Sequence, residues 1–256
     1  MKEPQARRYL YSACAAGLSA RLTAPIQHDT GILAASTLSV SGGHCAARAE
    51  NIRIGEIASA GAVSTQVTGI YSEEKKAWET LAMATIEKLN ILDVVTADRI
   101  SVRIVSHYPA EAAEPSILPL GTAFENLRVA GVGLKVNLDI SLFSEISTWS
   151  LLARRVAADP DLDRRIAATG EDPKTGIEKG LVMCSLAKSV EADSGAVKMT
   201  DDGMIDIPHF GKLYLAQFVM TPFMRRLTMF RIQLGCPVEG GIEGGDVAGN
   251  GHPYPP

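Results

Sequence analysis

Three histidines of the 256-residue chain could carry out proton transfer or bind a metal: His44 after a Gly-Gly turn, His107 in a predicted loop, and His209 before a predicted strand. Histidine titrates near neutral pH and is a common zinc ligand. None of the three has a second histidine two or four residues away, so the spacing of HxH and HExxH sites is missing. We expect turn or surface histidines, retain these three as the catalytic candidates, and predict no metal and no cofactor.

Carboxylates recur at a nearly constant spacing. Glu50, Glu87 and Glu125 each open a similar motif (ENIRI, EKLNI and ENLRV), at spacings of 37 and 38 residues. Glu56 and Asp93 form a second equivalent set. Two aligned carboxylates could act as general acid and base. A residue that occurs once per repeat usually serves the repeat itself, so we favour a structural role.

The remaining motifs that could do chemistry are incomplete. Asp201, Asp202 and Gly203, with Asp193 and Asp206 nearby, offer oxygen ligands for calcium, but the DxDxDG spacing is missing. We therefore favour a solvated turn there. The glycine-rich segments match neither GxGxxG nor GxxxxGK[ST], and there is no GxSxG motif.

The period indicates that the chain is built from repeated units. Residues 50–69 align with residues 87–106, and apolar residues alternate in each segment, as in Ile52 and Ile54 or Ile100, Val102 and Ile104. Period two is typical of a strand with one buried face. Each unit therefore predicts a strand–turn–strand element. The alternation changes phase between Ile86 and Leu89, which predicts a bulge. Residues 212–215 and 226–234 form a fourth copy.

A helical insertion is predicted near 141–169. Residues 141–158 carry apolar side chains at helical period, among them Trp149, until Asp159-Pro160 ends the helix. A second short helix follows at 161–169, and 171–178 reads as a polar loop. If the two helices cover the β-structure, their junction would favour a pocket. Trp149 is the candidate binding residue there.

We therefore predict a mainly β fold, a repeat-built β-domain with this helical insertion. A β-solenoid is favoured, and a β-prism or sandwich stays open because the period alone does not separate them. A single domain spans residues 1–236, and the Gly/Pro-rich residues 237–256 are predicted to form an extended, mobile tail.

Composition excludes some classes of protein. The net charge is −4 and no basic stripe is present, which argues against nucleic-acid binding. No apolar run reaches the roughly 18 residues that span a bilayer. Cys14, Cys45, Cys184 and Cys236 lie far apart, which predicts buried free thiols rather than disulfides or zinc ligands.

The N-terminus has two interpretations. Arg7-Arg8 followed by small apolar residues resembles a twin-arginine export signal, whereas alternating Tyr9, Tyr11, Ala13 and Ala15 predict a first strand. We favour the strand over a signal within residues 1–20. Cytoplasmic residence is then the default, and export is the alternative.

Residues 89–100 (LNILDVVTADRI) and 124–132 (FENLRVAGV) are similar to the strand repeats of bacterial proteins of the choice-of-anchor P family. The resemblance covers about residues 84–136. It implies secretion and a cell-surface anchor, which we do not expect in this chain. It implies no function.

Two classes of function follow. The first is a non-enzymatic structural or scaffold protein that forms homo-oligomers or binds a protein partner through its β-surfaces, with the C-terminal tail as one route of contact. The second is an enzyme or small-ligand-binding protein with a site between the helical insertion and the β-core.

Overall fold

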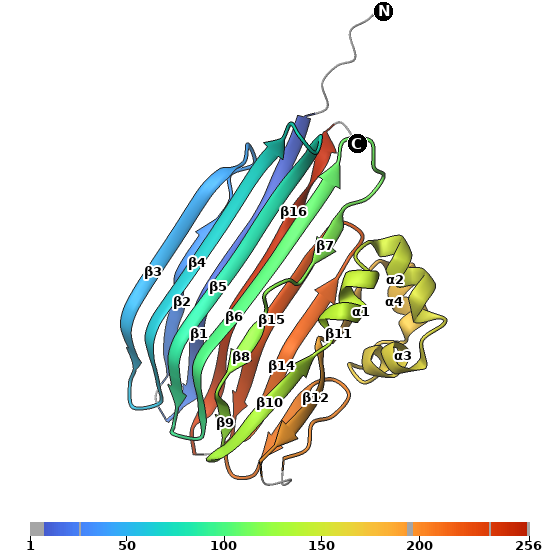
Figure 1. Cartoon of the computed structure of the whole chain (residues 1–256). Coiled ribbons are helices and arrows are strands. Elements are labelled where there is room, and N and C mark those ends of the chain that lie inside the picture. The colour runs from blue at the N-terminus through green and yellow to red at the C-terminus, as the bar shows by residue number, and fades with distance from the viewer. Residues whose placement is uncertain (1–7, 26, 194–196, 236, 255–256) are drawn as a thin grey trace, which may run out of the picture.

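The chain folds into two antiparallel β-sheets that face each other (Figure 1). The structure is a computed structural model, and it describes residues 8–25, 27–193, 197–235 and 237–254. Strands β1 and β16 of one sheet pack against β4, β5 and β6 of the other, with the core between them. The mainly β prediction is confirmed, and the arrangement is a sandwich of two sheets rather than the favoured solenoid.

The first sheet, sheet A, has the strand order β11-β14-β15-β16-β1-β2, with β13 beside β14. Its strands are β1 (Arg8–Ala24), β2 (His28–Thr37), β11 (Val182–Ser185), β13 (Met204–Ile207), β14 (Gly211–Met220), β15 (Arg225–Leu234) and β16 (Glu239–Tyr254). The second sheet, sheet B, has the order β12-β10-β9-β6-β5-β4-β3, with β7 and β8 beside β6. Its strands are β3 (Gly43–Ile54), β4 (Ala58–Ser72), β5 (Ala77–Ile91), β6 (Val95–Pro109), β7 (Ser116–Leu118), β8 (Ala123–Glu125), β9 (Leu127–Val129), β10 (Val132–Leu138) and β12 (Ala187–Ala192).

A row of residues with positive φ forms a crease across each sheet. In sheet B, Asn51, Lys88 and Asn126 have positive φ angles of 52°, 53° and 50°. In sheet A, three residues also have positive φ angles: Ala34 at 56°, Ala216 at 49° and Gly245 at 63°. A positive φ interrupts the alternation of side chains, so Ile86 and Leu89 are both buried. The change of phase is confirmed, but the predicted bulge is wrong, because the β5–β6 register stays constant across it and no residue is inserted.

The predicted C-terminal tail is wrong. Residues 239–254 form β16, which lies between β1 and β15 and pairs with both. Glycine suits this central position because large side chains from neighbouring strands fill the space. A Cβ on Gly244 would lie 2.7 Å from Ile86 and from Phe230. Composition indicated mobility, whereas the glycines serve close packing.

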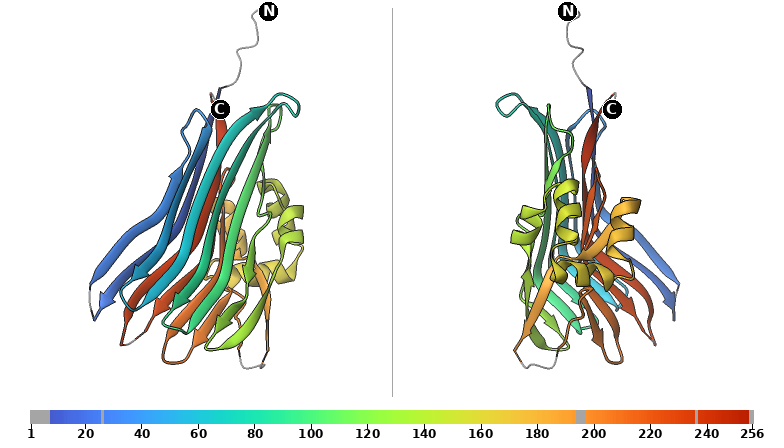
Figure 2. Two further views of the ribbon diagram at one scale, coloured as in Figure 1. Left: turned by 60° about the vertical axis from the view of Figure 1, so that its left-hand side comes forward. Right: turned by 90° about the vertical axis from the view of Figure 1, so that its right-hand side faces the viewer.

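The helical insertion is confirmed, with different boundaries. Helices α1 (Ile140–Glu145), α2 (Trp149–Val156), α3 (Pro160–Ala167) and α4 (Pro173–Lys179) lie together along one side of the sandwich (Figure 2). The predicted single helix over 141–158 is broken because the carbonyls of Ile146 and Ser147 accept bonds from Arg225 and Ile117 instead of from the next helical turn.

Helix α4 was missed. Asp172 caps its first turn by accepting from the Thr175 N–H at 2.8 Å, Pro173 opens it, and Gly180 ends it with a φ of 71°. These are ordinary helix signals that a polar composition concealed. None of the helices in the described ranges has the length and apolar character needed to cross a membrane.

The sandwich has one covered side and one open side. Near the helices, the chain passes from β11 in sheet A to β12 in sheet B through Leu186 alone. On the other side, β2 and β3 are the outer strands of their sheets. The predicted first strand is confirmed as β1, and Arg7 lies outside the described residues.

Candidate functional site

The three histidine candidates do not form a site. His44 lies on β3, where its Nδ1 is 3.1 Å from the Thr68 hydroxyl, and His107 lies on β6, 3.3 Å from a Glu79 carboxylate oxygen. His209 is exposed in the turn between β13 and β14 of sheet A, with a φ of 60°. Two candidates thus lie on sheet B and the third on a turn of sheet A.

The recurring glutamates form one row across sheet B. Glu50 pairs with Ala62, Ala62 with Glu87, Glu87 with Arg99, and Arg99 with Glu125. Each glutamate directly precedes a residue with positive φ, so the row follows the crease. From Glu50 to Glu87 the chain runs along β4 and returns along β5, and from Glu87 to Glu125 it runs along β6 and returns through β7 and β8.

The aspartate-rich segment around Asp201, for which a solvated turn was favoured over a calcium site, is held by its own side chains and by Arg164. Asp201 forms an ion pair with Arg164 at 2.8 Å, and the Thr200 hydroxyl bonds to Asp202. Within the described residues, no group of three or more histidine, cysteine, aspartate or glutamate side chains could hold a metal ion.

Buried side chains fill the junction between helices and sheet, where the second class of function needs a cleft. Arg225, only 1% exposed, donates to the Ile146 carbonyl at 2.9 Å and to the Met220 sulfur at 3.2 Å. Its guanidinium lies 5.9 Å from the centre of the Phe218 ring. Desolvation lowers the pKa of Arg225 to about 10. Within the described chain no carboxylate forms an ion pair with it.

A second buried arginine lies close by. Arg165 of α3 forms an ion pair with Asp139 at 2.9 Å and donates to the Ser185 carbonyl at 2.6 Å. Cys184 lies close to both arginines, and burial raises the pKa of its thiol to about 12. Of the other thiols, Cys14 is exposed and Cys45 half-buried, so the prediction of buried thiols holds only for Cys184; Cys236 lies outside the described residues. Trp149, the binding candidate, is half-buried at the start of α2.

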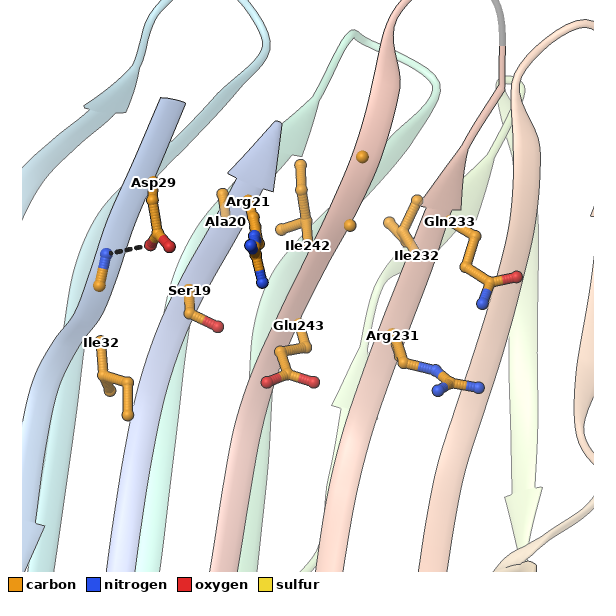
Figure 3. Close-up of a pocket in the computed structure, with 13 residues that line it drawn as sticks. Ser19, Ala20, Arg21, Asp29, Ile32, Arg231, Ile232, Gln233, Ile242 and Glu243 are labelled. Carbon is orange, nitrogen blue, oxygen red and sulfur yellow. Dashed lines mark hydrogen bonds between the residues drawn. The ribbon is translucent and has the colours of Figure 1, made fainter. Parts of the chain in front are cut away.

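A groove of about 520 Å³ lies instead on the outer face of sheet A (Figure 3). One wall comes from β1 and β2, the other from β15, and β16 forms the floor. The residues that line it are Ser19, Ala20, Arg21, Asp29, Gly31, Ile32, Arg231, Ile232, Gln233, Gly240, Gly241, Ile242 and Glu243.

Two glycines form the floor for different reasons. Gly240 has a φ of 145°, and a Cβ there would lie 2.4 Å from the Arg21 carbonyl, so the backbone requires glycine. Gly241 has no such constraint. The nearest atom to a Cβ on it would be the Ile232 carbonyl at 3.6 Å, an ordinary contact. The fold would accept a side chain at Gly241, and its absence keeps the groove open.

Charged side chains of both signs surround this floor. Arg231 stacks on the Tyr214 ring at 4.6 Å, and its Nε is buried without a hydrogen-bond partner in the described structure. Asp29 accepts a 2.8 Å bond from the Gly31 N–H. Arg21 and Glu243 make no side-chain hydrogen bond or ion pair within the described residues. Their groups remain available for a bound molecule.

The sequence analysis missed this groove. Its residues come from two segments, 19–32 and 231–243, that lie near opposite ends of the chain, and none belongs to a motif. The one available signal was the repeated Gly-Gly pair, at 240–241 and 244–245, beside Ile242 and Val247. Their composition predicts a tail, whereas they belong to a strand, β16.

Comparison with known proteins gives one match. The model of a family described as a domain of unknown function, DUF8256, matches residues 9–174, from β1 into α4. No curated protein and no solved structure matches the chain. The resemblance of residues 84–136 to the choice-of-anchor P family stays a prediction.

Proposed function

The chain belongs to the DUF8256 family, and we propose that it is a non-enzymatic scaffold that binds an extended segment of a partner protein on the outer face of sheet A. The observation that carries this proposal is Gly241. The backbone accepts a side chain there, yet the position is empty and lies at the centre of the groove.

The lining fits a peptide better than an apolar ligand. Arg21 and Arg231 offer planar donors for carboxylates and carbonyls, while Asp29 and Glu243 accept from amines and amides. Exposed Ile32 adds one apolar contact at the rim. The groove offers both donors and acceptors above the open glycine floor of β16. They suit a bound peptide, because its backbone carries both N–H and C=O groups.

The test is selection of displayed random peptides on the wild-type protein, with counter-selection on Gly241→Trp. A tryptophan at 241 fills the groove, and the neighbouring atoms leave room for its Cβ. We expect peptides that bind the wild type and bind G241W about tenfold or more weakly, since they lose contact with the groove floor.

Two further variants distinguish binding in the groove from nonspecific binding to the protein surface. Arg21→Ala removes an unpaired guanidinium and should weaken the selected peptides. Ser12→Trp adds the same bulk as G241W at an exposed position on β1 outside the groove, and should leave binding unchanged. Enrichment of the same peptides on wild type and G241W would contradict the proposal.

The alternative, an enzyme or ligand-binding protein with a site at the helix–sheet junction, has less support. Arg165, Arg225 and Phe143 from the two parts contact partners across that junction and are buried. Their packing leaves the groove on sheet A as the better-supported place for binding.

We also infer that the strand pairs β3–β4 and β5–β6 are copies of one unit. The support is that Glu50, Glu87 and Glu125 share one cross-strand row and that each precedes a residue of positive φ. A common ancestor of these strand pairs accounts for both the motif and the crease.

A further inference from the structure

Strand β3 is an unprotected sheet edge. Figure 1 shows it as the outermost strand of sheet B, and in the described structure it pairs with β4 alone. Edge strands are usually guarded by proline, lysine or irregular backbone. Residues 43–50 contain no proline and no lysine, and no residue between His44 and Glu50 has positive φ. We call residues 44–50 of β3 the arm, and its backbone can pair with another strand.

The inner face of the arm is only partly covered by β2. Cys45, Ala47 and Ala49 point toward the interior but are only half-buried, whereas Val63 and Val67 of the neighbouring β4 are 0% exposed. All three side chains are small. A strand placed beside β3 could approach closely and remove this row from water.

We propose that the missing neighbour is β3 of a second copy of this chain, paired antiparallel with Ala47 opposite Ala47. Sheet B then continues across a two-fold axis between the two molecules, as expected for an isologous dimer. Cys45, Ala47 and Ala49 meet the same row from the second copy, with Cys45 opposite Ala49 at both ends. This interface lies apart from the groove on sheet A.

Charge and the crease at Asn51 together favour this register. A two-fold axis normal to the sheet places residues of the outer face opposite residues of the same face. Moving the axis to the next residue of β3 therefore shifts the pairing of the two strands by two residues. With Ala47 on the axis, His44 faces Glu50 of the second copy, and the whole arm 44–50 is paired. Centring the dimer on Ala46 leaves Glu50 opposite Gly42, without a charged partner, and centring it on Arg48 sets Arg48 against itself. Like charges directly opposite are unfavourable. Centring the dimer on Ala49 sets Arg48 against Glu50, but the paired segment then includes Asn51, whose positive φ changes the faces of the side chains.

Other contacts are compatible with this pairing. His44 uses its Nδ1 for Thr68, which leaves its Nε2 for the carboxylate. Glu50 also forms an ion pair within its own strand, with 2.7 Å between its Oε1 and the Nε of Arg48, and both side chains are more than half exposed. The crease at Asn51 ends the arm, because the side chains change faces there.

Cysteine cross-linking of the full chain tests the register. Ala47→Cys should give a disulfide-linked dimer on mild oxidation, and Ala49→Cys should link to the native Cys45 of the second copy. The matched control is Ala46→Cys, which faces Arg48 and should stay uncrosslinked, as should the wild type. A dimer mass by light scattering accompanies these results. Equal linking of A46C and A47C, or a wild-type monomer, would overturn the proposal.

A charge exchange provides a second measurement that leaves the core untouched. His44→Glu sets carboxylate against carboxylate at both ends, and should weaken dimerisation about tenfold. The double variant His44→Glu/Glu50→His restores opposite partners and should recover most of the affinity. If H44E dimerises as well as wild type, the register is wrong.

Discussion

Two arginines determine how the helices attach to the β-core. Arg225 reaches from β15 to the carbonyl that ends α1, and Arg165 reaches from α3 to the carbonyl of Ser185 in β11. A buried cation needs hydrogen bonds to offset its desolvation, and here each arginine donates to one backbone carbonyl and to one side chain. The sequence shows both arginines among charged neighbours, with nothing that marks them as buried.

The ion pair of Arg165 with Asp139 gives a prediction at the scale of single residues. Asp139→Ala leaves a guanidinium that is only 3% exposed without its carboxylate. We expect a loss of about 3 kcal/mol or more in the free energy of unfolding, measured in urea. Asp139→Leu with Arg165→Met removes both charges and should cost less. Equal losses for the two proteins would contradict this account.

Candidate site residues were the least predictable from sequence. His44, His107 and His209 were chosen for their chemistry, but chemistry alone does not place residues on the same face. The groove depends on an empty position, Gly241, between side chains from other strands. The sequence shows that residue 241 is glycine. Only the atoms around it in the structure show that the backbone would also accept a larger residue at this position.

At the scale of elements, the crease explains the motif that dominates the sequence. Asn51 and Asn126 adopt left-handed backbone angles, which asparagine tolerates better than most residues, and Lys88 occupies the equivalent place. Alternating apolar residues predicted the long strands correctly, because burial on one face of a sheet fixes their period. The pairing of those strands into two sheets was not encoded in the period.

Position 88 therefore tests the crease. Lys88→Asn should leave the free energy of unfolding unchanged or slightly raise it. Lys88→Val should lower it by about 1–2 kcal/mol, because a β-branched side chain fits poorly at a φ of 53°. Lys212→Val, at an exposed position of β14 without positive φ, is the matched control and should be neutral. The same loss for both valines would show that the crease carries no strain.

At the scale of the whole molecule, the sandwich is asymmetric. Helices and the β11–β12 passage cover one side, and β2 and β3 leave the other side open. The groove on sheet A begins at β2, so it lies beside the open side. A dimer through β3 would bring two such grooves onto one assembly, which would let the scaffold hold two partner segments at once.

The C-terminal strand decides whether this molecule folds at all. Strand β16 pairs with β1 along one edge and with β15 along the other, so a chain truncated after residue 236 loses the centre of sheet A. Ile242 and Val247 leave the core with it, and the facing side of β5 is uncovered. We expect no cooperative thermal unfolding by circular dichroism, and aggregates by light scattering, because two unpaired edges and an apolar face are exposed.

Two glycine variants test the same strand without removing it. Gly244→Val places its side chain against Ile86 and Phe230 and should lower the melting temperature, whereas Gly241→Val lies over the open groove and should not. If the truncated chain instead unfolds cooperatively at the wild-type temperature, and both valine variants are neutral, residues 239–254 are the tail that their composition indicates. The opposite result places a glycine-rich strand at the centre of the sheet, where small residues let two layers of large side chains meet.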